Sequence, residues 1–596
     1  MNRSLPTFPK LLPTLAAMAA IFAVARPAAA IDTDFGGSDF KVRWDNTMRA
    51  NLGIRTTAPD PILGANPAFT AGEYSFGRGG ISTSRLDLLS ELDASWQGQL
   101  GARASFAGWY DLAYQNHSVK IDPALAALGV PSGYGPSGSG LSQYALDRYR
   151  GPWGEFLDAF GWARFDVGSV PVTVKAGRHS IYWGESLLLG GAIHGVAYSQ
   201  VPLDLIKGFA NPGTEIKELY RPLAQISTSV QMTPELSLSG QYFLEWQSYL
   251  YPEAGTFVGP ADFAFNGPYG QFARLGNNSF FFKNGGSNDP RKHDWGASLR
   301  YSPGFVDGTF GFYYRRYADK LAAVLLLPNP GGQGPMSPTL NSPFQYQQFY
   351  AEGVDLAGLS YARQIAGVST AIEAAYRHNT PLAAQSLGLT TPPSAPLAPV
   401  LFPDGLPKLI GNSYQARGDT LHLVANALGT LPPSRLWSVA TWNVEGTYSR
   451  LITVRDNRDM FFGMGYGVCR TSPQLSAAGL AKNKNDGCAT ENEAGVGASF
   501  TPTWYQVFSG VDLLMPLTGS LAFWGNSPVT LGGNAGSGTY SAGLGADIRN
   551  TLRLDVKYVG FYGNTLDNGK MVTSSNGLLS LLKNRESVVF TAKTTF

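Results

Sequence analysis

The stretch that decides the fold runs from Phe40 to Arg55 and reads FKVRWDNTMRANLGIR. Seven of its eight even-numbered positions are apolar, and none of its eight odd-numbered positions is. A period of two indicates a β-strand whose two faces meet different surroundings. The stretch is also much longer than the usual strand of about five or six residues. These features predict a strand that separates two solvents.

The same alternation recurs along the chain, with segments that begin near residues 86, 102, 236, 310, 440 and 552. Aromatic residues such as Trp44, Trp96 and Tyr314 stand near the ends of the apolar stripes, where a membrane interface would place them. Short and long connections alternate. Eight short turns, one of them at residues 501–504, and nine long loops predict about 18 strands. Sixteen is the alternative count, because segments 356–362 and 505–515 alternate poorly.

We therefore expect an all-β fold, a single transmembrane antiparallel β-barrel with short periplasmic turns and long extracellular loops. Closure satisfies every backbone hydrogen-bonding group in lipid, and it leaves no free sheet edge. Residues 31–596 show no linker or shift of composition that would divide them, so we expect them to form this one barrel.

The first thirty residues predict export. Arg3 and Lys10 precede an apolar segment at residues 11–25, and Ala28 to Ala30 fit a cleavage site, so residues 1–30 are predicted to be a signal peptide. The apolar segment is too short for a membrane-spanning helix. Without Arg3, Lys10 and Arg26 the chain has 42 basic and 43 acidic residues, a net charge of −1, which gives no support for nucleic-acid binding. The predicted location is the outer membrane, in contact with its lipid.

Polar residues occupy the predicted inward positions, which indicates a water-filled lumen. For most of the inward charges we expect cross-strand ion pairs that brace the wall. The first strand is unusually basic, with only Asp45 as an acid. Acidic residues of the second strand, Asp87, Glu91 and Asp93, are expected to neutralise much of this charge, so the basic strand by itself does not predict anion selectivity. The candidate lumen residues on the wall are Arg43, Arg49, Arg103 and Arg315.

A loop, rather than a plug, is expected to narrow the lumen. Only residues 31–39 precede the first strand, too few for an N-terminal plug. The best candidate is the loop at residues 183–222, whose start, SLLLGGAIHG at residues 186–195, is apolar and rich in glycine. That composition favours packing inside the barrel, and a solvated surface loop is the alternative. The charged constriction candidates in this loop are Asp204, Lys207, Glu215, Lys217, Glu218 and Arg221.

Cysteine and histidine usage is sparse. Cys469 and Cys488 lie in one stretch rich in Lys, Asn and Gly, and in an oxidising compartment they predict a disulfide that staples a loop. Two thiols without a nearby histidine fall short of the four ligands of a metal site. Of the six histidines only His422 is predicted to face inward, and it lacks the spacing of a catalytic triad. We expect no enzyme and no cofactor.

One part of the chain resembles a known family. Residues 176–186 (AGRHSIYWGES), followed by GGAIHG and by residues 211–222 (NPGTEIKELYRP), are similar to proteobacterial outer-membrane proteins known as domain of unknown function 1302. The matching positions are Gly177, Arg178, Trp183, Gly184, Glu185, Ser186, Pro212, Gly213, Glu215, Lys217 and Glu218. The opening FKVRWDNT and the paired cysteines are similar too, so the likeness spans nearly the whole mature chain. His179 replaces the usual Gln, and residues 195–208 diverge from the family pattern.

The resemblance implies a porin-like protein that moves small molecules, hydrophobic or amphipathic ones among them. Members are often encoded beside a periplasmic lipid-handling protein and a large inner-membrane exporter, which are therefore the implied partners. The departures mean that no ligand preference is carried over. The alternative function is a sealed barrel that acts as the outer-membrane scaffold of such a system.

Arg178 conflicts with the alternation. Alternate residues of a strand share one face, so Arg178 should lie on the same lipid-facing side as Val172, Val174 and Ala176, where a charge is costly. A β-bulge at Gly177 would turn Arg178 into the lumen, and a position at the watery rim is the alternative.

Overall fold

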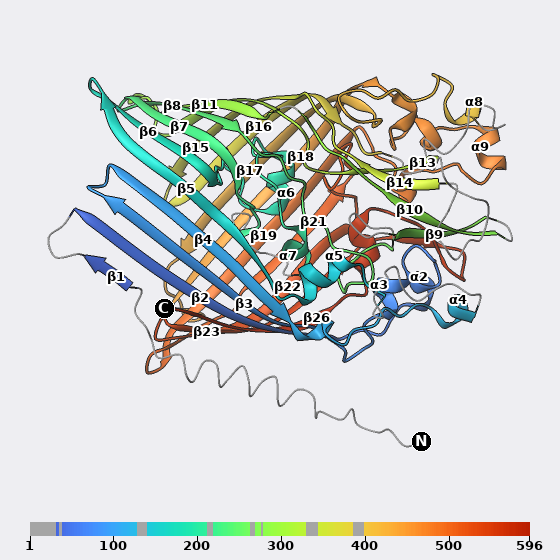
Figure 1. Cartoon of the computed structure of the whole chain (residues 1–596), viewed down its shortest axis with the longest axis horizontal. Coiled ribbons are helices and arrows are strands. Elements are labelled where there is room, and N and C mark those ends of the chain that lie inside the picture. The colour runs from blue at the N-terminus through green and yellow to red at the C-terminus, as the bar shows by residue number, and fades with distance from the viewer. Residues whose placement is uncertain are drawn as a thin grey trace, which may run out of the picture.

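The computed structural model describes residues 31–34, 39–127, 140–210, 218–262, 269–275, 278–291, 293–328, 344–384 and 398–596. Its main feature is one antiparallel sheet whose tilted strands wrap around a common axis (Figure 1). Each wall strand pairs with the next along the chain, and β2 pairs antiparallel with β26, which closes the sheet into a barrel. Residues 1–30, the predicted signal peptide, lie outside the described residues.

Eighteen strands of the described chain build the wall, which confirms the predicted count. β20 and β21 count as one strand because their partners in β19 and β22 keep a single register across Met515 and Pro516. A short extra strand, β1 (Ile31–Asp34), pairs with the start of β2. The wall comprises β2 (Phe40–Arg55), β3 (Ile81–Trp96), β4 (Leu100–Asp111), β5 (Trp153–Val167), β6 (Val170–His179), β7 (Leu223–Thr233), β8 (Leu236–Phe243), β11 (Trp295–Tyr301), β12 (Thr309–Tyr317), β15 (Val354–Ile365), β16 (Val368–Pro381), β17 (Arg417–Leu431), β18 (Val439–Asp456), β19 (Asn492–Phe508), β20 (Val511–Leu514), β21 (Leu517–Trp524), β22 (Ser537–Ile548), β23 (Leu552–Tyr562) and β26 (Ser587–Thr595).

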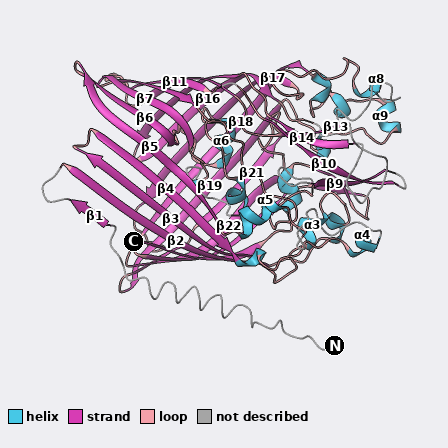
Figure 2. Cartoon of the chain, viewed as in Figure 1, coloured by secondary structure: helices cyan, strands magenta, loops and turns pink. Residues whose placement is uncertain are grey.

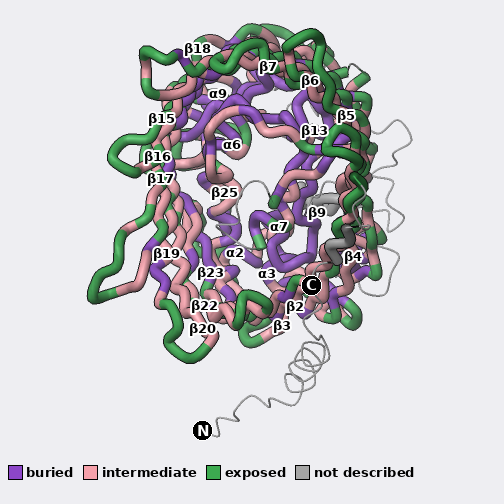
Figure 3. The backbone as a smooth tube through the Cα atoms, turned by 90° about the vertical axis from the view of Figure 1, so that its left-hand side faces the viewer, coloured by how far each residue is buried: buried purple, intermediate pink, exposed green. Residues whose placement is uncertain are grey.

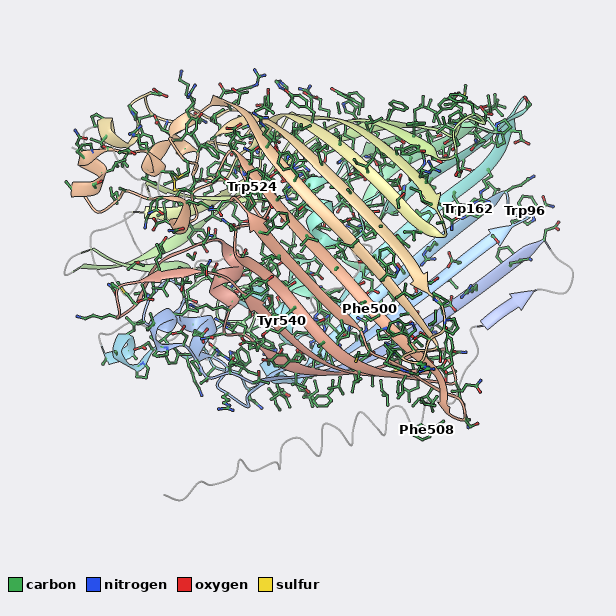
Figure 4. The ribbon with its side chains drawn as sticks, turned by 180° about the vertical axis from the view of Figure 1, so that it is seen from behind. Trp96, Trp162, Phe500, Phe508, Trp524 and Tyr540 are labelled. Carbon is green, nitrogen blue, oxygen red and sulfur yellow. A yellow bond between two sulfur atoms is a disulfide. The ribbon has the colours of Figure 1, made fainter. Side chains whose placement is uncertain are left out.

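The outer face of the wall is apolar and exposed. Trp44, Phe156, Ile372 and Leu544 expose between 44% and 64% of their surface. A soluble protein would bury such side chains, whereas a barrel in a membrane presents them to hydrocarbon. Aromatic side chains mark both ends of the wall: Trp96 and Phe508 lie toward the turn end, and Trp524 lies toward the loop end (Figure 4). The alternation in sequence therefore corresponds to lipid outside and a lumen inside.

Within the described ranges, none of the helices has both the length and the apolar character needed to cross a membrane.

The turn end differs from the prediction at one hairpin. Residues 501–504 were expected to turn, but β19 continues to Phe508, and the chain turns at Ser509 and Gly510. The predicted strand at residues 505–515 therefore spans this hairpin. Pro502 suggested a turn, yet a strand tolerates it because only one ladder donor is lost: the Pro502 carbonyl still accepts from the Met515 amide at 3.0 Å.

Most of the short helices and a small four-stranded sheet gather at the loop end (Figure 2). Side chains from five loops form one buried core there, which includes Phe76, Tyr114, Tyr198, Phe257 and Leu321. The loop helices are α2 (Pro61–Gly64), α3 (Thr70–Tyr74), α4 (Pro123–Ala127), α5 (Gln143–Ala145), α6 (Leu189–His194), α7 (Leu205–Ala210), α8 (Ala398–Leu401) and α9 (Pro473–Ala477). The small sheets contain β9 (Tyr269–Leu275), β10 (Asn278–Asn288), β13 (Ala323–Pro328) and β14 (Phe344–Phe349), and separately β24 (Thr565–Asp567) and β25 (Val572–Ser575). Single turns of tighter or wider helix occur at Leu112–Tyr114, Leu146–Arg150, Arg458–Met460, Gly467–Cys469, Lys484–Asp486 and Leu578–Leu582.

Two further contacts fasten the loops. Cys469 and Cys488 form a disulfide, as predicted, and both lie in a small loop core with Val468 and Leu475. Glu73 of the first long loop is fully buried, and it forms ion pairs with Arg55 of β2 and with Arg585, whose Nε lies 2.9 Å from Glu73 Oε2. Burial by itself would raise the pKa of Glu73, but Arg585 and Arg55 together hold the pKa below its usual value.

Candidate functional site

The loop that follows β6 enters the barrel. In the view along the barrel axis, α6 and α7 lie inside the ring of wall strands (Figure 3). We call residues 183–200 the inserted segment. Ala192, Ile193, His194 and Val196 of this segment are almost fully buried. Its composition explains the position, because an apolar, glycine-rich chain can pack closely against a wall of polar side chains.

Two wall carboxylates bind the backbone of the inserted segment. Glu373 of β16 accepts hydrogen bonds from the amides of Glu185 (2.7 Å) and Val196 (2.5 Å). Glu445 of β18 accepts from the amides of Leu187 (2.6 Å), Leu188 (3.0 Å) and Gly191 (3.0 Å). Hydrogen bonds to a charged acceptor are stronger than neutral ones. These two side chains therefore fix both ends of the turn that contains α6.

Two wall arginines bind the carbonyl groups of the same segment. Arg377 of β16 donates to the carbonyls of Ile193 (2.7 Å) and Gly195 (3.1 Å), and its guanidinium lies 4.0 Å from the centre of the Tyr198 ring. Arg315 of β12 donates to the carbonyls of Val196 (2.8 Å) and Tyr198 (2.7 Å). Both arginines are at most 1% exposed. Both wall arginines thus bind carbonyl groups of the inserted segment.

A pair of buried histidines holds the end of α6. The Nδ1 atoms of His194 and His422 lie 2.9 Å apart. His194 Nε2 lies 2.7 Å from the Gly532 carbonyl and must donate to it, while His422 Nε2 lies 2.8 Å from the Thr420 hydroxyl. With both rings neutral, one continuous chain of donors and acceptors is complete: Thr420 to His422, His422 to His194, His194 to Gly532. Burial lowers the pKa of His194 to about 4, with nearby Arg377 acting in the same direction.

A cavity of about 1170 Å³ remains between the inserted segment and the wall formed by β16–β23. One side of it is apolar and comes from loops, with Leu188, Phe209, Leu531, Leu578 and Leu579. The other side belongs to the wall and consists mainly of hydroxyl side chains and glycine, such as Thr441, Ser499, Thr518, Ser520 and Thr539. A solute in this cavity would meet an apolar face and, opposite it, a polar face on which Lys557, Glu445 and Glu493 are the ionisable residues among those described.

The charged residues predicted in the loop do not gather at one point. Asp204 accepts from the Lys207 amide at 3.0 Å at the start of α7, and Lys207 Nζ donates to the Glu218 carbonyl at 3.2 Å. Glu218 is exposed, and Arg221 lies 3.7 Å from Glu155. Glu215 and Lys217 lie outside the described residues.

The motif residues lie at the entry of the inserted segment. Gly184 has a φ of +95°, and a Cβ there would approach Glu373 Oε2 to 2.4 Å, so glycine suits both the turn and the contact. The Trp183 amide donates to Gln200 at 3.0 Å, and the Ser186 hydroxyl bonds the Tyr182 hydroxyl. Glu185 lies 3.4 Å from Arg300 of β11.

The bulge predicted at Gly177 is wrong. The registers of β6 with β5 and β7 run without a shift through Gly177 and Arg178. Arg178 therefore stays on the outward face, at the loop end of β6, where it forms an ion pair of 2.6 Å with Glu245. This placement matches the alternative at the rim, and the pairing reduces the cost of an outward charge.

The wall arginines divide into two kinds. Arg103 forms the expected cross-strand ion pairs with Glu91, Asp93 and Asp158, and Arg43 pairs with Asp45 at 2.6 Å. Arg315, expected to brace the wall, instead binds loop carbonyls. Asp87 pairs with Arg85 at 2.7 Å, and Glu91 and Asp93 pair with Arg103. Arg49 is in register with Asp87, but no ion pair within 4.0 Å among the described residues includes it, so the expected neutralisation of the first strand stays a prediction.

Sequence reasoning missed several cavity residues. Glu373 and Glu445 belong to the inward wall charges for which cross-strand ion pairs were expected, but they bind the backbone of a loop instead. Leu578 and Leu579 lie in a loop that was expected to be solvated; the run LLSLL at residues 578–582 is the signal that could have singled them out.

These features define a porin-like outer-membrane β-barrel with an inserted loop, because single-chain barrels of this size with an apolar belt occupy outer membranes. The family model described as "Protein of unknown function (DUF1302)" matches residues 11–596, so the chain belongs to this family. No curated protein matches the chain.

Several solved structures are similar over most of their length. Acinetobacter baumannii OccAB1 is 8% identical, with 93% of this chain and 96% of that chain covered and a TM-score of 0.40. Pseudomonas aeruginosa OpdK with vanillate is 8% identical, with 93% and 98% covered and a TM-score of 0.38. Salmonella typhi OmpF in complex with daunomycin is 8% identical, with 95% and 100% covered and a TM-score of 0.33.

Proposed function

We propose that this protein is an outer-membrane channel that passes small molecules, hydrophobic or amphipathic ones among them, through its lumen. The observation that carries the proposal is the cavity of about 1170 Å³ between the inserted segment and the wall. Its apolar loop side supports solutes with an apolar part, and its hydroxyl-rich wall side supports passage beside water. The loop end faces the cell exterior, the turns face the periplasm, and residues 1–30 direct export as a signal peptide.

In this proposal the inserted segment is the constriction. The segment crosses the lumen and is fixed by Glu373, Glu445, Arg315 and Arg377, so its position sets the width of the path. The family resemblance adds a periplasmic lipid-handling protein and an inner-membrane exporter as candidate partners. Catalysis is not part of the proposal, because both ring nitrogens of His422 are engaged in buried hydrogen bonds.

A release variant tests the proposal in planar lipid bilayers. In Glu373→Ala/Glu445→Ala the five backbone amides of the inserted segment lose their carboxylate partners, so the segment loosens. We expect wild-type protein to conduct ions and the release variant to conduct several times more. The matched control is Glu91→Ala, which removes a wall carboxylate that pairs with Arg103 rather than with the loop.

The alternative, a sealed barrel that serves as a scaffold, gives the opposite result. It draws support from the buried core that joins five loops at the loop end. If neither wild type nor the release variant conducts, the scaffold function replaces the channel. Equal conductance of all three proteins would instead show that the inserted segment is not the constriction.

A further inference from the structure

The charge of the lumen wall is unevenly distributed. Most inward positions of β19, β21 and β22 that border the cavity are uncharged, among them Gly497, Ser499, Thr518, Ser520 and Thr539, and the exception is Glu493 near the loop end of β19. Basic residues lie around the seam where the barrel closes, on β23, β26 and β2. Among the described residues, a solute in the cavity therefore meets positive charge on the seam side only.

Basic residues face one another across this seam. Arg49 of β2 pairs in register with Lys593 of β26, and Lys593 pairs in register with Arg553 of β23. Like charges directly opposite on neighbouring strands destabilise a sheet. Two acids lie nearby. Asp555 lies 2.8 Å from Arg553, and Asp87, which is in register with Arg49 on its other side, forms its ion pair with Arg85 at 2.7 Å. Among the described residues, no ion pair within 4.0 Å involves Arg49, Lys593 or Lys557.

Lys557 connects the seam with the cavity. It is the only lysine or arginine among the described residues that line the cavity. Arg49 and Arg553 act on it electrostatically, as do Asp555 of its own strand and Glu218 of the loop. The seam thus adds positive charge behind the one cation that a solute can reach. Although it contains Asp555, the strip of seam residues carries a net positive charge, and low-dielectric walls focus its field into the cavity.

The acidic lining residues lie at another level of the cavity. In register, Lys557 is opposite Gly543 of β22, and the same row continues through Pro516 to Thr501 of β19. Glu493 lies eight positions from Thr501 along β19, toward the loop end. Glu445 directs both carboxylate oxygens at amides of the inserted segment.

The apolar surface begins a short distance from the cation. Leu188 of the inserted segment faces position 497, where an added Cβ would lie 2.8 Å from its Cδ1. Position 497 is four residues from the row of Lys557, or roughly 13 Å along a strand. Phe209, Leu578 and Leu579 continue the apolar side. A cationic point and an apolar surface are therefore spaced like the head and the body of an amphiphile.

We propose that the cavity binds amphipathic anions, with the anionic head at Lys557 beside Arg49 and Lys593, and the apolar body against Leu188, Phe209 and the leucines of residues 578–579. This assignment rests on the proposed channel function and names the class of solute that the channel selects.

Binding is measured first, without reference to conductance. Purified full-length protein in nanodiscs is dialysed to equilibrium against labelled decanoate, decyltrimethylammonium or acetate, with empty nanodiscs as the blank. Decanoate has head and tail, decyltrimethylammonium has the same tail with the opposite charge, and acetate has the head alone. Because decyltrimethylammonium cannot pair with Lys557 and acetate cannot contact the apolar side, we expect decanoate to bind about tenfold or more tightly than either other probe.

Variants then locate the head group. Lys557→Gln should lower decanoate affinity about tenfold and leave binding of decyltrimethylammonium the same or stronger. Lys593→Gln, at the back of the strip, is the second variant, and it should weaken decanoate less. Lys570→Gln removes an exposed lysine of the loop between β24 and β25 and serves as the matched control.

The outcomes separate the two proposals. Equal binding of decanoate and decyltrimethylammonium, or decanoate binding unchanged in both Lys557→Gln and Lys593→Gln, overturns the anion site. Decanoate that binds in nanodiscs while no protein conducts in bilayers upholds the site and overturns the channel. Conductance that decanoate blocks at lower concentration than decyltrimethylammonium, with the block weakened in Lys557→Gln, places the site in the conducting path.

Discussion

Charged side chains inside this barrel find their partners in two different ways. Arg103 does so with carboxylates of its own wall, as cross-strand pairs usually do. Glu445 and Arg377 do so with backbone amides and carbonyls of a loop. The second arrangement satisfies the polar groups of an irregular segment that would otherwise be unpaired inside the barrel. The wall charges are thus part of how a loop is kept in the lumen.

Glu73 is the residue at which the loss of one buried charge should have the largest effect on stability. Glu73→Gln leaves Arg55 and Arg585 buried beside each other without a counter-charge, and breaking a buried pair costs about 3–5 kcal/mol. We expect the folded barrel to convert to its unfolded, slower-migrating form at lower temperature, and the first long loop to become sensitive to protease. Gel mobility after stepwise heating measures the first effect, and limited proteolysis measures the second.

The control for Glu73 is an ion pair at the surface. Asp307→Asn breaks the contact of Asp307 with Arg363, at 3.5 Å and with the carboxylate side chain 80% exposed. Such pairs contribute at most about 1 kcal/mol. A shift of the same size in both variants would show that the buried cluster does not hold the loop end together.

At the level of elements, the sequence predicted the repeated strands, but it did not predict local features that depend on one particular neighbouring residue. Alternation and connection lengths were enough for 18 strands, because each strand must match lipid on one face and solvent on the other. The hairpin at Ser509 and Gly510 was missed because its strands carry Pro502 and Pro516 and alternate poorly. The continuous register at Gly177 was missed because parity cannot show that Glu245 lies beside Arg178.

The inserted segment was singled out in the sequence by its composition, but its partners could not be. Glu373 and Glu445 stand 188 and 258 residues away from the amides that they bind. An inward carboxylate looks the same in the sequence whether its partner is an arginine of the next strand or the backbone of a distant loop. Only the closed barrel brings the two together.

The histidine pair makes the position of α6 dependent on pH. The pKa of His194 is lowered to about 4, whereas a histidine released into water has a pKa of about 6.5. The packed form binds the proton less readily than the released form. The contribution of His194 to packing is therefore complete above about pH 6.5, and it is lost as pH falls toward 4, by up to about 3 kcal/mol. His422, Glu493 and Arg377 are the charged or titratable groups that face His194.

We expect channel conductance in bilayers to rise, with larger fluctuations, as pH is lowered from 6.5 to 4. His194→Gln/His422→Gln lacks both titrating rings and should lose this response in the same pH window. A response of equal size in the double variant would assign it to other groups, such as the carboxylates of the wall.

In the whole molecule, the barrel wall separates a lipid-facing surface from a lumen-facing surface, and the two surfaces accept different side chains. The lipid face accepts large apolar side chains at almost any position. The lumen face accepts large side chains only where the inserted segment and the other loops leave room. Beside the cavity its strands carry mainly glycine and hydroxyl residues. Gly497 and Gly519 bring this difference to neighbouring strands at nearly the same level, since Ala498 pairs with Gly519. Gly497 faces the lumen near Leu188, and Gly519 faces outward. A Cβ added at Gly519 would have the Thr539 carbonyl oxygen as its nearest atom, 3.9 Å away.

The same substitution at these two positions tests the architecture and the path together. Gly497→Trp should place an indole in the cavity against Leu188, whose flexible side chain can move aside, so the barrel folds while the path narrows. We expect conductance and decanoate block to fall severalfold. Gly519→Trp should place the same indole in lipid, among side chains of its own kind, with conductance close to wild type. Gel mobility before and after heating shows that both variants are folded, and single-channel recording compares them. Equal effects at the two positions would mean that the two faces of the wall do not differ as the alternation requires.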